Sequence, residues 1–320
     1  MEEKVHKLIN SSTNKSCTLD PIPTSLVMDC IDVLLLIIMK MNNLSLESGL
    51  FADDWKCALV LPLLKKPGLD LLYKNDTPLS NLQYVSKLTE KMVFEQIHTH
   101  MMTHSLYPEF QSAYRKNHST ETALVRVMND ILMKMNTQEV TLLVMFDLSA
   151  AFDTVNHNIL LKRLNEGLGI CGLALEWFRL YLAKRCQRVS IDGSLSERFS
   201  LECGVPQGSC LGPLLFLTYA SKLFRVVEDQ LPHCYADDAQ IYLSFKPISN
   251  ISQEDAVRAM ECCIEKITRR WLIHDRLLLN DDKTEFIIIG TRQQLKKLQA
   301  MNINLFPSKG FPIEIGRAHV

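Results

Sequence analysis

Three aspartates stand where their carboxylates could act together. Asp147 directly follows the apolar segment 140–146, and Asp237 and Asp238 lie side by side between two short apolar stretches. Three such anions repel one another unless a cation lies among them. Carboxylate oxygens suit Mg²⁺, which typically takes only one or two carboxylates together with water and substrate phosphates. Two such ions about 3.5–4 Å apart would support in-line phosphoryl transfer, which is the chemistry of polymerases.

Each of these motifs also has a structural interpretation. An Asp-Asp pair is common in a solvated turn, and an aspartate that ends a strand is often a helix cap. Judged singly, each motif is more often structural than catalytic. Their combination favours catalysis. Three blocks occur along this chain with long intervals between them. The blocks are FDLSAAFDTVNH (Phe146–His157), GVPQGSCLGP (Gly204–Pro213) and YADD (Tyr235–Asp238).

With these blocks the chain closely resembles the reverse transcriptases of non-LTR retrotransposons, especially the chicken-repeat-like and jockey-like groups. The resemblance covers most of the chain, since PLSNL (Pro78–Leu82), FQSAYRKNHSTETAL (Phe110–Leu124) and LNDDKTEFIIIG (Leu279–Gly290) also look like blocks of that family. It implies an RNA-directed DNA polymerase that adds deoxynucleoside triphosphates to the 3′ end of a DNA primer on an RNA template. The RNA–DNA hybrid would be bound largely through its backbone and shape.

The resemblance also implies roles for single residues at the carboxylate site. Asp147, Asp237 and Asp238 would be catalytic. Together with Leu148 they would hold two Mg²⁺ ions, for which Mn²⁺ could substitute. Asp153 is instead expected to begin a helix, near the positive end of the helix dipole.

Further residues would contact the substrates. Phe152, with Ala151 beside it, would be the aromatic gate that collides with the 2′-hydroxyl of a ribonucleotide; the alternative is core packing. Gln207 and Gly208 would lie under the templating base and the incoming sugar, where glycine permits close backbone approach; a structural turn is compatible with that role. Lys283 would approach the triphosphate and could protonate the pyrophosphate leaving group.

The basic turn at Lys65-Lys66 is open to two interpretations, a contact to template or phosphates and an ordinary surface turn. Thr77 departs from the family pattern, because an arginine that grips the triphosphate usually precedes the proline of the PLSNL block. Loss of such a clamp would weaken transition-state stabilisation. The sequence also leaves little room for a thumb after the last block, and no endonuclease precedes the first, as in a truncated or decayed copy.

Two alternatives to an active retrotransposon enzyme follow. The first is a decayed, non-catalytic remnant that still binds nucleic acid. The second is a relative with the same fold, such as a group II intron-type reverse transcriptase, which would carry different flanks and a maturation domain. The SAAFDTVNH and HSTETAL blocks favour the retrotransposon over this second alternative.

Composition fits this hypothesis without demanding it. Of the 320 residues 47% are hydrophobic, enough for one large core or two modest ones. The 35 basic and 36 acidic residues nearly cancel, but basic residues cluster, for instance at Lys184-Arg185 with Arg188, so the surface can carry both signs. The chain is not short and carries no export signal, so its ten cysteines are expected to be reduced intracellular thiols. They contain no Cys-x-x-Cys pair, which argues against structural zinc. Without an export leader or a membrane-spanning run, we expect a soluble protein of the nucleus or cytoplasm with no obligate protein partner.

The candidate residues need a sheet to bring them together. Apolar and β-branched runs predict strands at residues 57–64, 140–146 and 286–289. A hairpin is predicted at residues 187–203 around Asp192-Gly193, and a very tight one with YADD at its bend. Helices are predicted at residues 26–41, 82–102 and 160–182. Three further helices are predicted to begin after the capping residues 119–122, at Gly212-Pro213, and after Ser252 and Asp255.

These elements predict an α+β (α/β) fold: a right-hand polymerase palm and fingers, a mostly antiparallel palm sheet with packed helices, and a truncated or absent thumb. The predicted domains are a helical lead-in at residues 1–56, fingers at 57–135, a palm with the active site at 136–290, and a palm or thumb remnant at 291–320.

Overall fold

The computed structural model describes residues 9, 17–68, 70, 76–115, 117–227, 231–280, 282–298 and 314–317. The chain divides into two compact units. The first combines Met1–Leu106 with Phe152–Tyr219, and the second combines Tyr107–Ala151 with Ala220–Val320. Each unit is therefore assembled from segments that are distant in sequence. The domain limits expected at residues 56, 135 and 290 stay predictions, and parts of the expected lead-in and of the expected C-terminal remnant lie outside the described residues.

The second unit is built on a five-stranded sheet with the order β12-β11-β3-β9-β8. Its strands are β3 (Val140–Phe146), β8 (Leu231–Tyr235), β9 (Asp238–Phe245), β11 (Glu285–Gly290) and β12 (Glu314–Arg317). All neighbours pair antiparallel except β11 and β12, which are parallel. The apolar run of β3 lies in the middle and is almost wholly buried, as its sequence predicts.

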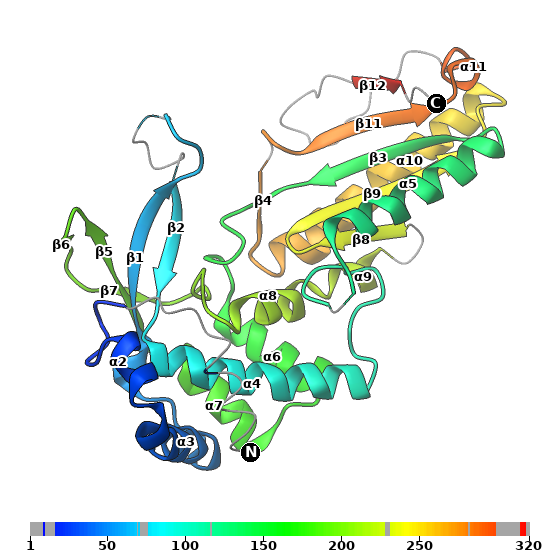
Figure 1. The fold of residues 1–320 in the computed structure, drawn as a ribbon. Helices are drawn as coiled ribbons and strands as arrows, with labels where there is room; N and C mark the ends of the chain where they lie inside the picture. The colour runs from blue at the N-terminus through cyan, green and yellow to red at the C-terminus, as the bar shows by residue number, and fades with distance from the viewer. Residues whose placement is uncertain are drawn as a thin grey trace. The chain divides into compact units, whose positions relative to one another are not determined.

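Two long helices cover the faces of this sheet (Figure 1). They are α5 (Thr120–Asn136) and α10 (Asn250–Ile267). One face of α5 buries Val127, Ile131 and Met135 against Leu143 of β3 and Tyr242 of β9. The opposite face of the sheet carries α10, which continues into the π-helical segment Thr268–Ile273. Shorter elements complete the unit: β4 (Leu148–Ser149), β10 (Leu278–Leu279), α9 (Leu223–Val226) and α11 (Arg292–Leu295).

The first unit contains a smaller mixed sheet with the order β2-β1-β5-β6, to which β7 adds by pairing with β5. Its strands are β1 (Cys57–Leu64), β2 (Asp76–Asn81), β5 (Arg185–Ile191), β6 (Ser194–Leu195) and β7 (Phe199–Leu201). The strand predicted at residues 57–64 and the hairpin predicted around Asp192-Gly193 are confirmed. The parallel pairing of β1 with β5 joins strands that are far apart in sequence.

Helices make up most of the rest of the first unit (Figure 1), which also contains an aromatic cluster. The helices are α2 (Thr24–Asp29), α3 (Ile31–Ser48), the short 3₁₀ turn Asp53–Lys56, α4 (Tyr84–Thr103), α6 (His157–Leu168), α7 (Gly172–Leu182) and α8 (Gly212–Ala220). Phe51 lies at the centre of the cluster, with its ring centroid 5.1–5.5 Å from those of Trp55, Trp177 and Tyr181. Such edge-to-face contacts add to the free energy of burying the rings.

Two predicted helices are each divided in the structure. The helix predicted at residues 160–182 is two helices, because Gly169 adopts a left-handed conformation (φ 69°) that ends α6. The helix predicted at residues 26–41 is interrupted at Cys30, between α2 and α3. It is also not buried on all sides, since Val33 and Leu36 are exposed.

Helix starts show how well caps can be predicted. Ser119 caps α5 as expected, with its side chain accepting the backbone N–H of Thr122. The helix α10 begins after Ser249, and Ser252 is only its capping-box partner, so the expected capping position was wrong by three residues. The side chain of Asn156 caps α6. Asp153 lies in the preceding turn, so its predicted helix-start position was wrong.

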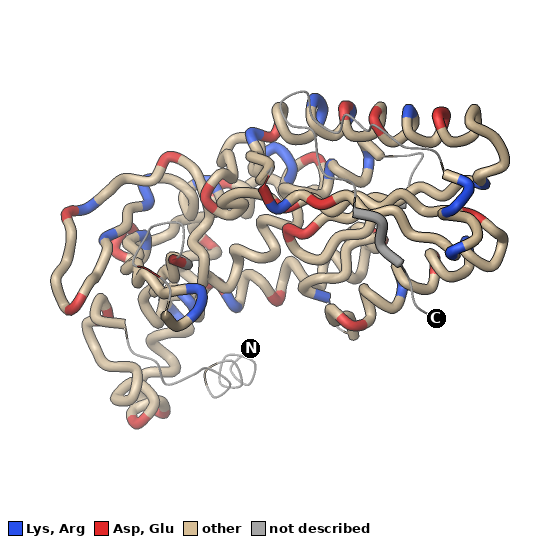
Figure 2. The backbone as a smooth tube through the Cα atoms, turned by 90° about the horizontal axis from the view of Figure 1, so that it is seen from above, with Lys and Arg blue, Asp and Glu red and all other residues tan. Residues whose placement is uncertain are grey.

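Basic and acidic residues are interspersed along the backbone of both units (Figure 2). The predicted basic cluster at Lys184-Arg185 with Arg188 is wrong in one member, because Arg185 is 1% exposed and belongs to the core. Among the described residues, no helix is long and apolar enough to cross a membrane.

Candidate active site

Two strand ends bring the three aspartates to one edge of the sheet in the second unit. Strand β3 pairs with β9 up to Phe146 and Ala239, and the register continued by one residue sets Asp147 opposite Asp238. Strands β8 and β9 close a hairpin whose turn consists of Ala236 and Asp237. The tight YADD hairpin and the strand that runs into Asp147 are present as the sequence predicts.

The three carboxylates repel one another at this edge. Partial burial raises the pKa of Asp237, and the charge of Asp147 raises it further, while Lys283 opposes both effects. The pKa of Asp238 is also raised, by partial burial first and then by the charges of Asp237 and Asp147. Like charges opposite each other on paired strands destabilise a sheet. The arrangement therefore costs stability unless a cation joins it.

Asp147 is fixed by a segment that follows the short strand β10. The backbone N–H of Asn280 donates to the Asp147 carbonyl at 2.9 Å, and its side-chain Nδ2 donates to Oδ2 of Asp147 at 2.7 Å. The ammonium of Lys283 lies 3.5 Å from the same oxygen, although the Lys283 side chain is 64% exposed. Leu148 is buried and pairs with Leu279 of β10. No role was predicted for Asn280, although it lies in the LNDDKTEF block. Its contact with Asp147 is visible only in the fold, because the two residues are far apart in sequence.

These residues suit a divalent cation that brings ligands of its own. Within the described part of the chain, no group of three or more His, Cys, Asp or Glu side chains forms a ready-made metal cage. Mg²⁺ does not need one, because it keeps several waters and uses substrate phosphates as ligands. The mutual repulsion of Asp147, Asp237 and Asp238, and the approach of Lys283 to Asp147, both indicate that this edge attracts positive charge.

Phe152 lies in the first unit, against α8. Its ring stacks on Phe216 with centroids 5.1 Å apart, and the two rings are inclined by 24°. The Cα of Gly212 also faces the Phe152 ring, since a Cβ added there would lie 3.7 Å from Cε1. Phe152 is only partly buried. The ring is thus held in place on one side, which is compatible both with a gate and with packing.

The GVPQGSCLGP block contacts the PLSNL block within the first unit. The backbone N–H of Ser80 donates to the carbonyl of Gln207 at 2.8 Å. Gly208 has φ 115°, and a Cβ on it would lie 2.7 Å from the carbonyl oxygen of Ser80. Only glycine fits this backbone conformation and this close approach. Gly208 therefore lies close to the backbone of Ser80, and its expected approach to the incoming sugar stays a prediction.

A buried carboxylate supports the end of the same block. Glu90 is fully buried, and its Oε2 accepts the backbone N–H groups of Cys210 at 2.7 Å and of Leu211 at 3.3 Å. Its Oε1 accepts the hydroxyl of Tyr181 at 3.2 Å. Burial raises the pKa of Glu90, and the nearby Arg185 opposes this shift. The supporting role of Glu90 was not predicted, because its partners are distant in sequence.

The candidate residues divide between the two units. The second unit contains the metal candidates Asp147, Leu148, Asp237 and Asp238, together with the triphosphate candidate Lys283 and with Ala151, which was predicted beside the gate. The first unit carries the substrate candidates Phe152, Gln207 and Gly208. Lys65 and Lys66 lie exposed in the turn after β1.

Comparison with known proteins identifies the family. Residues 64–304 match the family described as reverse transcriptase (RNA-dependent DNA polymerase), and this match spans well over half of the chain. The chain belongs to the reverse transcriptase family. Among its relatives, this reverse transcriptase chain is 31% identical over 213 residues to the RNA-directed DNA polymerase from mobile element jockey of Drosophila melanogaster. That alignment covers 64% of this chain and 23% of the relative.

Two further likenesses agree with this assignment. The chain is 28% identical over 253 residues to the probable RNA-directed DNA polymerase from transposon BS of Drosophila melanogaster, covering 76% of this chain and 27% of the relative. The chain thus spans about a quarter of the length of these curated relatives. A telomerase from Candida tropicalis in complex with a fragment of telomeric RNA has a similar fold, with a TM-score of 0.51 at 14% identity. That likeness covers 79% of this chain and 44% of the telomerase chain, and it confirms the predicted α+β palm and fingers fold.

Proposed function

We propose that this reverse transcriptase chain adds deoxynucleotides to the 3′ end of a DNA primer on an RNA template, as part of a non-LTR retrotransposon enzyme. The observation that carries the proposal is the edge at which Asp147, Asp237 and Asp238 repel one another beside Lys283. A fold serves many functions, so the site rather than the architecture must support the chemistry. An enzyme with this activity would act in the nucleus or the cytoplasm, where RNA and deoxynucleotides are present.

Two Mg²⁺ ions would be held by the three aspartates together with Leu148, and Mn²⁺ could take their place. When bound, such ions stabilise the attacking and leaving oxygens of an in-line displacement. The hydrogen bond from Asn280 holds the Asp147 carboxylate in one orientation before any ion binds. This preorganisation lowers the cost of assembling the site.

The other candidates would then act on the substrates. Lys283 is exposed and long enough to exchange its contact with Asp147 for a phosphate, and its ammonium could give a proton to the leaving pyrophosphate. Phe152, stacked on Phe216 and beside the small Ala151, would reject a 2′-hydroxyl. Gln207 and Gly208 would support the templating base and the incoming sugar, on a loop held by Ser80.

Primer extension on a poly(rA)–oligo(dT) hybrid with Mg²⁺ tests the proposal. Asp237→Asn should reduce extension by about a hundredfold or more, because it removes charge that stabilises the transition state. The matched control is Asp255→Asn, which makes the same substitution at an exposed residue paired with Arg258 on α10. The control should extend like the parent chain.

The opposite outcomes separate the alternatives. Equal extension by the parent and by Asp237→Asn would contradict the metal site. A parent chain that binds the hybrid without extending it, and that regains extension with Thr77→Arg, would be a decayed enzyme. Loss of hybrid binding altogether would leave only an inherited fold.

A further inference from the structure

A side chain outside the assigned site reaches the turn that carries Asp237. Gln111 is 2% exposed and lies in the FQSAYR segment ahead of α5, for which no role has yet been given. Its Nε2 donates to the carbonyl of Ala236 at 3.2 Å, and its Oε1 accepts the backbone N–H of the same residue at 3.1 Å. Oε1 also accepts the backbone N–H of Ala113 at 3.0 Å. One amide thus clamps both backbone polar groups of Ala236.

The clamped residue has an unfavourable backbone conformation. Ala236 has φ 58°, in the left-handed region, and it is the first of the two turn residues between β8 and β9. Glycine normally supplies positive φ in such two-residue hairpin turns. For a residue with a Cβ this conformation costs about 1–2 kcal/mol. The contacts from Gln111 therefore act where the hairpin would otherwise tend to relax, directly before Asp237.

The segment that carries Gln111 is itself attached to the hairpin. The backbone N–H of Cys234 donates to Phe110 at 2.9 Å, and that of Ser112 donates to Cys234 at 3.0 Å. Gln111 and Cys234 thereby form a parallel bridge on the outer edge of β8. The clamp and the turn are thus held in register by main-chain hydrogen bonds.

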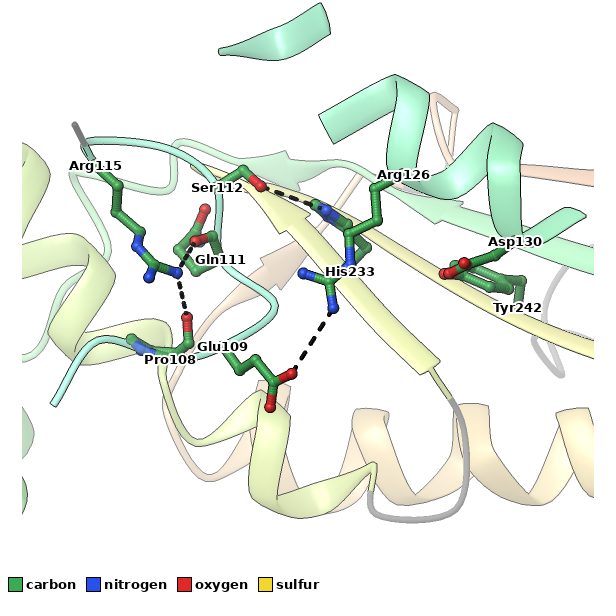
Figure 3. Close-up of polar contacts among 9 residues, drawn as sticks. All are labelled: Pro108, Glu109, Gln111, Ser112, Arg115, Arg126, Asp130, His233 and Tyr242. Atoms are coloured by element: carbon green, nitrogen blue, oxygen red, sulfur yellow. Dashed lines mark hydrogen bonds and ion pairs between the residues drawn. The ribbon is translucent and has the colours of Figure 1, made fainter. Parts of the chain in front are cut away.

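Side chains on both sides of Gln111 fix the segment further (Figure 3). Arg115 donates through Nη1 to the carbonyls of Pro108 at 3.2 Å and of Gln111 at 3.1 Å. Ser112 lies 3.4 Å from Nε2 of the buried His233. The backbone of Gln111 is thus held independently of Ala236, as a support for a turn must be.

We propose that Gln111 is a positioning residue that sets the conformation of the turn and so the direction of the Asp237 carboxylate. The inference rests on the function proposed above. A neutral amide suits the role, because it offers one donor and one acceptor without charge. A carboxylate could not donate to the Ala236 carbonyl and would add a negative charge beside Asp237.

Gln111→Met tests this role, since methionine has a similar length but cannot form the clamp. The matched control is Tyr242→Phe, which removes another hydrogen bond of the same sheet, that from Tyr242 to Asp130 at 2.6 Å. The first readout is amide hydrogen exchange of Ala236 by NMR, which needs no activity. Exchange should accelerate about tenfold or more in Gln111→Met, as expected for a lost hydrogen bond, and stay within about twofold of the parent in the control.

The second readout is primer extension as a function of Mg²⁺. Gln111→Met should raise the Mg²⁺ concentration for half-maximal extension and lower kcat, with the KM for the hybrid unchanged. Gln111→Leu, which also removes both the donor and the acceptor without adding charge, should show the same changes in case Gln111→Met does not fold. Unchanged Ala236 exchange, equal acceleration in Tyr242→Phe, or parent-like Mg²⁺ dependence would each overturn the inference. A parent chain without extension would instead overturn the proposed function, and exchange alone would then decide whether the clamp exists.

Discussion

The two units place negative charge in opposite ways. In the first unit Glu90 is fully buried, and its two oxygens accept hydrogen bonds from Cys210, Leu211 and Tyr181. At the carboxylate edge of the second unit, Asp237 and Asp238 remain partly or largely accessible and repel each other. In the first unit, hydrogen bonds from the protein itself stabilise the carboxylate. At the edge of the second unit, the carboxylates need a cation that the protein does not supply.

This contrast separates a structural carboxylate from a candidate catalytic one. A buried charge that is paired and hydrogen-bonded fixes the parts around it, and removing one partner is costly. Carboxylates whose pKa values are raised by one another, at an accessible edge, are typical of functional sites. Substitutions in the two regions should therefore have opposite effects on stability.

The largest expected effect is at the buried carboxylate. Glu90→Gln should lower the free energy of unfolding by about 3–5 kcal/mol, because three hydrogen bonds to a buried carboxylate lose its charge and the buried Arg185 loses a nearby negative charge. Urea denaturation measures the change. Glu176→Gln is the matched control at an exposed pair with Arg179, and it should cost at most about 1 kcal/mol. Equal effects of the two substitutions would mean that Glu90 is not the support described above.

The next effect concerns the loop that Glu90 supports. Gly208→Ala combines an unfavourable φ of 115° with a Cβ placed 2.7 Å from Ser80, so it should destabilise the chain by about 2–3 kcal/mol. Gly193→Ala has a similar problem of positive φ (79°) but meets nothing within 4 Å, so it should cost only about 1 kcal/mol. Thermal unfolding compares the two. A Gly208→Ala chain as stable as Gly193→Ala would disprove the close approach.

A smaller effect should appear as a dependence on pH in the first unit. Burial lowers the pKa of His157, whose Nε2 lies 2.8 Å from the carbonyl of Gly204. In the unfolded chain this histidine gains a proton below about pH 6.5, before it does so in the folded chain. Stability should therefore fall as the pH drops below about 6.5, since the unfolded state binds more protons.

His157→Gln keeps a donor for Gly204 but cannot titrate. The stability of this variant should decrease less than that of the parent between pH 7.5 and 5.5, as measured by urea denaturation. Parallel curves for the two proteins would show that His157 does not contribute to the pH dependence.

Local patterns in the sequence predict much of the fold. The apolar runs of β1, β3 and β11 and the YADD turn lie where the periodicity and the turn residues indicate. The errors also have local causes. Gly169 ends α6 within a segment whose pattern predicts one continuous helix, and Ser249 rather than Ser252 is the N-cap of α10. Both interrupted helices would pass as single helices on hydrophobicity alone.

The supports of the site could not be predicted in this way. Asn280 holds Asp147 from 133 residues away, and Gln111 holds Ala236 from 125 residues away. Next to Lys184 in the sequence, Arg185 was predicted to lie on the surface. It is the first residue of strand β5, and its side chain is buried in the core. Such contacts depend on the pairing of distant strands, which no short motif encodes. The aspartates are visible in the sequence, whereas the residues that hold them are visible only in the fold.

The most direct test of the central claim is a Mg²⁺ titration of the stability of the parent chain and of Asp237→Asn. Without Mg²⁺, Asp237→Asn should be the more stable by up to about 1 kcal/mol, because it relieves the repulsion with Asp147 and Asp238. Added Mg²⁺ should stabilise the parent, by about 2.7 kcal/mol at a hundredfold excess over Kd, and should leave the variant nearly unchanged. If Asp237→Asn is the less stable without Mg²⁺, or if Mg²⁺ stabilises both chains equally, the carboxylate edge is not a cation site.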